Sequence, residues 1–197
     1  MIKAIVFDLD DTLISEYDYI KSGFKHIANL ISTDYKLEAS KIYEKILELF
    51  YETPKNVFDR VLEYYNIPYK NEDILSFVKL YREHKPSIKY YDDVVSFIKQ
   101  LKEKKLKIGI ITDGYIETQR AKLNVLKAYD LFDNIIITEE LGREYWKPHP
   151  KAYEMMKETF GIEYDEMMYI GDNPEKDFYI GHIYPVKTVR IIRENSI

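Results

Sequence analysis

The sequence contains no cysteine, so it can form neither a disulfide bond nor a metal site with thiolate ligands. It also lacks any apolar run close to the roughly 20 residues that a membrane-spanning helix requires, which predicts that no membrane is a partner. Basic residues do not dominate, since 29 lysines and arginines against 34 aspartates and glutamates give a formal net charge of -5. Together with the lack of a basic block, this balance argues against a nucleic acid as the main partner.

We also do not expect an N-terminal secretion signal. Such a signal needs an apolar segment of roughly 7–15 residues, and Asp8, Asp10 and Asp11 interrupt the chain before one could be complete. We therefore expect a cytoplasmic protein. A length of 197 residues allows one good-sized core, or one core with an inserted lobe.

The most informative stretch that is present runs from Ile5 to Leu13. Here an apolar strand ends in two carboxylates, Asp8 and Asp10, whose side chains point the same way because they lie two residues apart on an extended segment. Two like charges at the end of a buried strand repel each other unless a cation, a shared proton or a reacting group compensates them. The pair therefore suits metal-assisted covalent chemistry.

Predicted strands and helices alternate along most of the chain. The strands are expected over residues 3–9, 106–112, 134–138, 167–170 and 187–192, with helices over 92–104, 116–128, 150–160 and 174–181. Alternation of this kind is typical of a parallel sheet covered by helices on both faces. We predict an α/β fold with a Rossmann-like parallel sheet core.

About a hundred residues separate the first two predicted strands, far more than a crossover between parallel strands needs. Apolar residues at spacings of three and four predict four helices in this interval, over residues 19–32, 37–51, 56–66 and 71–83. Residues 14–88 are thus interpreted as an all-helical cap, inserted into a catalytic core made of residues 1–13 and 89–197.

Polar side chains stand where the predicted strands end, the edge at which open parallel sheets bind ligands. Thr112 and Asp113 end the second strand, Lys147 lies in the loop after the third, and Asp172 follows the fourth, with Asp177 five residues later. Carboxylates favour a hard cation such as Mg²⁺. A threonine hydroxyl and a lysine ammonium can both hold a phosphate group.

These segments resemble, in order, the four motifs of phosphatases of the haloacid dehalogenase (HAD) superfamily. The motifs are matched by residues 8–12, by Thr112, by Lys147 and by residues 171–177, so that the resemblance spans the whole chain. It implies a Mg²⁺-dependent phosphomonoester hydrolase that forms an aspartyl-phosphate and acts on a small phosphorylated metabolite, such as a sugar phosphate. The predicted cap resembles the helical, C1-type cap of that superfamily.

The resemblance also implies a role for each matched residue. Asp8 would be the nucleophile and Asp10 the general acid and base, while Thr112 and Lys147 would bind the phosphoryl group. Asp113 stands where many relatives carry asparagine, and we take it as a secondary candidate for phosphate binding.

The metal site follows from the same resemblance. Mg²⁺ would be held by the Asp8 side chain, the Asp10 main-chain carbonyl and Asp172, while Asp177 would support these ligands without touching the ion.

Substrate choice should reside in the cap, since a lid must admit one leaving group and exclude water. Glu16, Lys21 and Lys25 follow the first motif closely enough to be candidates for substrate contacts. The sequence does not decide between a monomer and a homodimer.

Three alternatives remain open. A phosphosugar mutase of the same superfamily would share the nucleophile but return the phosphoryl group to the substrate. A phospho-acceptor signalling domain also carries acidic residues, threonine and lysine at strand ends, although it needs no inserted lobe. The last alternative is a scaffold without catalytic turnover. The presence of all the expected catalytic residue types argues against it.

Overall fold

The computed structural model describes residues 1–194, and the chain divides into two compact units. The first unit comprises residues 1–17 together with the chain from residue 88 onwards, and the second comprises residues 18–87. The cap expected from the sequence, residues 14–88, differs from the second unit by a few residues at its start.

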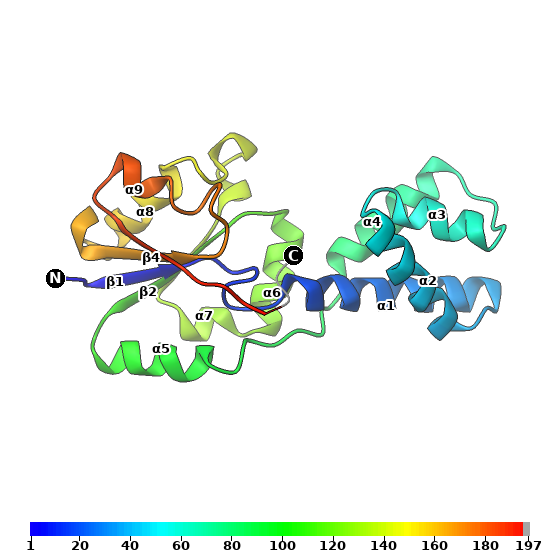
Figure 1. The fold of residues 1–197 in the computed structure, drawn as a ribbon, viewed down its shortest axis with the longest axis horizontal. Coiled ribbons are helices and arrows are strands. Elements are labelled where there is room, and N and C mark those ends of the chain that lie inside the picture. The colour runs from blue at the N-terminus through cyan, green and yellow to red at the C-terminus, as the bar shows by residue number, and fades with distance from the viewer. Residues whose placement is uncertain (195–197) are drawn as a thin grey trace. The chain divides into compact units, whose positions relative to one another are not determined.

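A five-stranded parallel sheet forms the centre of the first unit (Figure 1), with its strands in the order β3-β2-β1-β4-β5. The strand bounds are Ala4–Phe7 for β1, Lys107–Thr112 for β2, Asn134–Ile137 for β3, Met167–Gly171 for β4 and Lys187–Arg190 for β5. The α/β fold with a parallel sheet, predicted from the alternation of strands and helices, is confirmed.

Strand β1 occupies the middle of the sheet because its four residues are all apolar and all buried. A central strand of a parallel sheet is covered on both faces, so it needs a continuous apolar run rather than an alternating one. Phe7 lies opposite Ile110 of β2 and Ile170 of β4. The next residue, Asp8, therefore leaves the sheet between the ends of two neighbouring strands.

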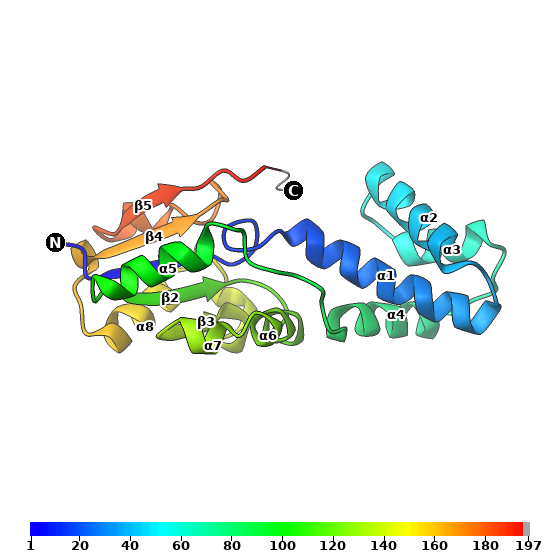
Figure 2. The same ribbon diagram turned by 90° about the horizontal axis from the view of Figure 1, so that it is seen from below.

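Helices cover both faces of this sheet (Figure 2). Ile5 and Phe7 of β1 pack with α5, α6 and α7 in one apolar cluster, while Ala4 and Val6 pack with α8 and α9 in another. Alternate side chains of a strand point to opposite faces, so β1 contributes to both clusters. The helix bounds are Val94–Glu103 for α5, Ile116–Val125 for α6, Ala128–Leu131 for α7, Lys151–Phe160 for α8 and Ile180–Ile183 for α9. Three short 3₁₀ helices cover Thr138–Glu140, Arg143–Tyr145 and Tyr164–Glu166.

Two helices of this unit differ from the prediction. The helix expected over residues 116–128 stops at Val125, because Lys127 adopts a left-handed conformation with φ of 50° before α7 begins.

The helix expected over residues 174–181 is wrong, since residues 174–179 form turns and bends and α9 has only four residues. The cause is Asp177, which is fully buried and whose carboxylate accepts a hydrogen bond of 3.0 Å from the main-chain N–H of Asn173.

Four helices make up the second unit, as the apolar spacing predicts. Their bounds are Glu16–Tyr35 for α1, whose first two residues belong to the first unit, Ala39–Glu52 for α2, Val57–Tyr64 for α3 and Asn71–Glu83 for α4. Ile27 and Ile31 of α1 and Ile42 and Ile46 of α2 are fully buried, each pair four residues apart on one helix face. Within residues 1–194, no helix combines the length and the apolar character needed to cross a membrane.

Candidate active site

Asp8 is held firmly at the end of β1. Its main-chain N–H donates a 2.9 Å hydrogen bond to the carbonyl of Ile170, which extends the pairing with β4 by one residue. The side chain is only 5% exposed. Strand pairing thus fixes the carboxylate at the polar edge of the sheet, where the sequence predicts a nucleophile.

Lys147 lies beside this carboxylate, in the loop between β3 and α8. Its Nζ atom is 2.6 Å from Oδ1 of Asp8 and 2.8 Å from Oδ1 of Asp177, and it donates a 3.0 Å hydrogen bond to the hydroxyl of Tyr169. An ammonium has three hydrogens to donate, and these three partners match them. Tyr169 is a residue of the site that the sequence analysis missed, because within β4 it looks like an ordinary core aromatic.

Three carboxylates gather at this edge. Oxygen atoms of Asp8, Asp172 and Asp177 lie within 4.8 Å of one another, with Asp172 partly exposed and the other two buried. Burial raises the pKa of Asp172, and the nearby charge of Asp177 raises it further. Oxygen ligands at this spacing suit a hard divalent cation.

The pKa of Asp8 is raised to about 7, mainly because burial penalises its charged form. Lys147 opposes this shift, while the charges of Asp177 and Asp10 add to it. The Lys147 ammonium therefore does not cancel the combined effects of burial and of the neighbouring carboxylates on Asp8. A site with uncompensated carboxylates is one that a bound cation would stabilise.

The Asp10 carboxylate contacts helix α6. Its two oxygens lie 2.7 and 2.8 Å from Nζ of Lys122, and Oδ2 accepts a 3.0 Å hydrogen bond from Gln119. Lys122 and Gln119 were also missed. The signal that could have found them is their register, since they share the buried face of α6 with Leu123, where polar residues are unusual.

Thr112 and Asp113 follow each other at the end of β2. The hydroxyl of Thr112 is buried and accepts a hydrogen bond from Gln119. The Asp113 carboxylate accepts from the hydroxyl of Thr138 at 2.7 Å and from the main-chain N–H of Lys147 at 3.1 Å. Asp113 thereby ties the loop that carries Lys147 to the end of β2, and its phosphate contact stays a prediction.

The three candidates for substrate contacts do not all belong to the same unit. Glu16 belongs to the first, where its main-chain N–H donates a 2.9 Å hydrogen bond to Asp11. Burial and the charge of Asp10 raise the pKa of Glu16 to about 7, against the opposing charge of Lys122. The other two candidates lie on α1 within the second unit, where Lys21 pairs with Asp18 at 2.7 Å and Lys25 is exposed.

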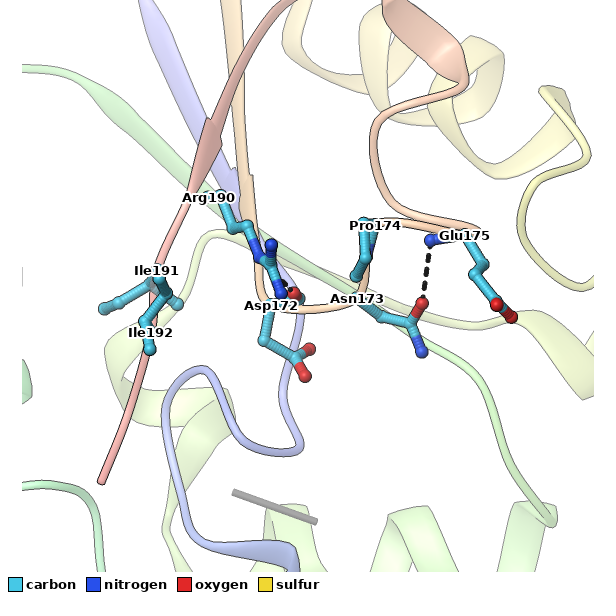
Figure 3. Close-up of a pocket in the computed structure, with 7 residues that line it drawn as sticks. All are labelled: Asp172, Asn173, Pro174, Glu175, Arg190, Ile191 and Ile192. Atoms are coloured by element: carbon cyan, nitrogen blue, oxygen red, sulfur yellow. Dashed lines mark hydrogen bonds between the residues drawn. The ribbon is translucent and has the colours of Figure 1, made fainter. Parts of the chain in front are cut away.

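Asp172 also lines a pocket (Figure 3). It is lined by Asp172, Asn173, Pro174, Glu175, Arg190, Ile191 and Ile192. Arg190 donates a 3.2 Å hydrogen bond to the main-chain carbonyl of Asp172, and the Asp172 carboxylate points away from Arg190. The backbone at this strand end is thereby held in place while the carboxylate remains available to a ligand.

The chain is similar to known proteins along most of its length. The family model of the haloacid dehalogenase-like hydrolases matches residues 5–191. A glyceraldehyde 3-phosphate phosphatase of Pyrococcus abyssi is 31% identical, over 96% of this chain and 81% of its own length. A pyrophosphatase PpaX of Bacillus cereus is 25% identical, over 87% of this chain and 75% of its own.

The fold has solved counterparts. The crystal structure of a HAD phosphatase from Thermococcus onnurineus superposes with a TM-score of 0.62 at 23% identity, covering 100% of this chain and 89% of the other. With the family model matching nearly the whole chain and relatives aligned along it, the chain belongs to the haloacid dehalogenase-like hydrolase family and groups with its phosphatases.

Proposed function

We propose that this protein is a Mg²⁺-dependent phosphomonoesterase, which transfers the phosphoryl group of a small metabolite first to Asp8 and then to water. The observation that carries the proposal is the group of three carboxylates that follow β1 and β4, two of which, Asp8 and Asp177, contact Lys147. The group combines a nucleophile, a metal-binding capacity and a fixed positive charge.

The donor set fits Mg²⁺, because it consists of carboxylate oxygens whose mutual repulsion the protein compensates only in part. Asp8, Asp172 and the main-chain carbonyl of Asp10 would hold the ion, with Asp177 supporting them. When bound, the ion supplies positive charge that offsets the negative charge developing on the phosphoryl oxygens.

In the first step, a carboxylate oxygen of Asp8 attacks phosphorus while the bond from phosphorus to the leaving oxygen breaks. Asp10 donates a proton to that oxygen, so that the product leaves as an alcohol. Lys147 stabilises the phosphoryl oxygens as a fixed charge, and Thr112 donates a hydrogen bond to them. The main-chain hydrogen bond that fixes Asp8 at the end of β1 holds its carboxylate in one position for this attack.

In the second step, water attacks the phosphorus of the aspartyl-phosphate. Asp10, now ionised, accepts a proton from that water, and the bond between phosphorus and the Asp8 oxygen breaks. Phosphate leaves, and both carboxyl groups return to their starting protonation states. One residue thus serves as acid and then as base.

The substrate class is proposed from the relatives. Among them are proteins named for glyceraldehyde 3-phosphate and, at lower identity, for pyrophosphate. A short phosphorylated sugar or related small metabolite fits the first group. Glu16, Lys21 and Lys25 remain the candidates for contacts with the part of the substrate that leaves.

The experiment is a phosphate-release assay with Mg²⁺ on a panel of an aryl phosphate, triose phosphates, hexose phosphates and pyrophosphate. We expect release from at least one monoester, and a loss of at least about a thousandfold in Asp8→Asn, because the nucleophile is gone. Asp130→Asn, which changes an exposed aspartate of α7, is the matched control and should keep the wild-type rate. Two results would contradict the proposal. One is turnover by Asp8→Asn near the wild-type level, and the other is a product that keeps the phosphoryl group in place of released phosphate.

A further inference from the structure

Helix α6 buries two polar side chains that no part of the proposed function has used. Gln119 and Lys122 are 1% and 2% exposed, and they lie three residues apart on the helix face that also buries Leu123. Burying an ammonium or an amide is costly unless every polar atom finds a partner. Their partners therefore explain why these residue types occupy the face.

Both partners belong to the proposed catalytic machinery. Lys122 binds both oxygens of the Asp10 carboxylate, at 2.7 and 2.8 Å. Gln119 contacts the same carboxylate at 3.0 Å and also the hydroxyl of Thr112. One short segment of α6 thus contacts both Asp10, the proposed acid and base, and Thr112, which is proposed to bind the phosphoryl group.

The direction of the hydrogen bonds follows from the chemistry of the partners. Both Asp10 oxygens face the ammonium of Lys122, which can only donate, so both oxygens act as acceptors in this structure. The atom of Gln119 that faces Asp10 is therefore the amide nitrogen, and this nitrogen also faces Thr112. The hydroxyl of Thr112 therefore accepts from Gln119 and keeps its own hydrogen. That hydrogen is the one with which Thr112 can donate to a phosphoryl oxygen.

Gly114 leaves the space that Gln119 occupies. A Cβ atom at this position would lie 3.2 Å from Cδ of Gln119, and the backbone there has φ of 133°. The turn after β2 is thus shaped around the amide.

We propose that Gln119 and Lys122 are positioning residues, which orient the Asp10 carboxylate for proton transfer and the Thr112 hydroxyl for phosphate binding. This inference rests on the proposed function. It deepens that function, because it assigns the orientation of two catalytic groups to one helix face.

The two residues should differ in their kinetic signatures. Lys122 contacts Asp10, so the loss of its side chain should impair proton transfer from Asp10 to the leaving group. Gln119 touches Thr112 as well, so its loss should also weaken the binding of inorganic phosphate.

The test compares kcat/KM for an aryl phosphate, whose leaving group needs little help from an acid, with that for an alkyl phosphate. Asp10→Asn sets the reference pattern, because it removes the acid itself and should affect the alkyl ester far more. We expect Lys122→Met and Gln119→Leu to lower the alkyl ester's kcat/KM by at least about tenfold more than the aryl ester's. Gln119→Leu should in addition raise the inhibition constant of inorganic phosphate.

Controls are available on the exposed face of α5. Lys102→Met and Gln100→Leu repeat the same chemical changes at exposed positions and should leave both substrates unaffected. Lys122→Arg keeps the charge and should recover part of the alkyl ester's rate. If Lys122→Met does not fold, the alkyl and aryl phosphates can still be compared with Gln119→Leu and Lys122→Arg.

Equal losses on both substrates would assign α6 a structural role and overturn the inference, while leaving the proposed function intact. A wild-type protein that hydrolyses neither ester would overturn the proposed function, and this inference with it.

Discussion

The Nζ atom of Lys147 lies 2.8 Å from Oδ1 of Asp177, and neither side chain is exposed to solvent. The same ammonium lies 2.6 Å from Asp8, which is also buried. One positive charge therefore serves two buried carboxylates from different strand ends. Such a pairing makes folding and the assembly of the active site depend on the same contact.

The first prediction concerns the loss of this ammonium. Lys147→Met should lower the free energy of unfolding by about 3–5 kcal/mol, because it leaves the buried carboxyl groups of Asp8 and Asp177 without their cationic partner. Chemical denaturation in the presence of a chelator measures the change without compensation by a divalent ion. Lys102→Met, at an exposed site on α5, should change stability by less than about 0.5 kcal/mol. A similar small change in Lys147→Met would show that the pair contributes nothing net.

Much of the fold could be predicted from apolar patterns. Helix α4 has the predicted bounds, residues 71–83, because Pro68 and Pro86 flank a single amphipathic segment. Strand β1 was found because a central parallel strand is apolar throughout. Local apolar patterns, a periodic one in α4 and a continuous one in β1, were sufficient to predict these two elements.

The turn at residues 174–179 could not be predicted in this way. Asp177 is buried and contacts both the main-chain N–H of Asn173 and the ammonium of Lys147, which is 30 residues away in sequence. These contacts favour a turn over the helix that local spacing allows. For the same reason, the motif residues of the site were identified by resemblance, whereas Gln119 and Lys122 were missed. The role of these two residues follows from their contacts with Asp10, which is more than a hundred positions away in the sequence.

The second prediction concerns the metal. Asp172→Asn removes one charged oxygen ligand from the carboxylate group but keeps a side chain of the same size. We expect the Mg²⁺ concentration for half-maximal activity to rise by about tenfold or more, with activity partly restored at high Mg²⁺. Titration of activity with Mg²⁺ after treatment with a chelator measures this. Asp130→Asn on α7 is the control, and an unchanged Mg²⁺ requirement in Asp172→Asn would remove Asp172 from the proposed ligands.

The last prediction concerns pH and Glu16. The pKa of this carboxyl is raised from an ordinary value of 4.5 to about 7, because the partly buried side chain is desolvated and lies near the charge of Asp10. Between these two pH values the folded chain keeps a proton that the unfolded chain has lost, so stability falls as pH rises through this window. Glutamine resembles the protonated form at every pH. Glu16→Gln should therefore be more stable than the wild type at pH 8, by roughly 1–3 kcal/mol, and the gap should narrow toward pH 5.

Denaturation curves at several pH values measure that gap. Taking the difference between the variant and the wild type removes the contribution of Asp8, whose raised pKa affects both proteins alike. Glu158→Gln changes an exposed glutamate of α8, and its stability difference should not vary with pH in the same way. A gap for Glu16→Gln that stays constant from pH 5 to pH 8 would mean that Glu16 titrates alike in the folded and unfolded chains. Its burial next to Asp10 and Lys122 would then carry no electrostatic cost, contrary to the environment that the start of α1 provides.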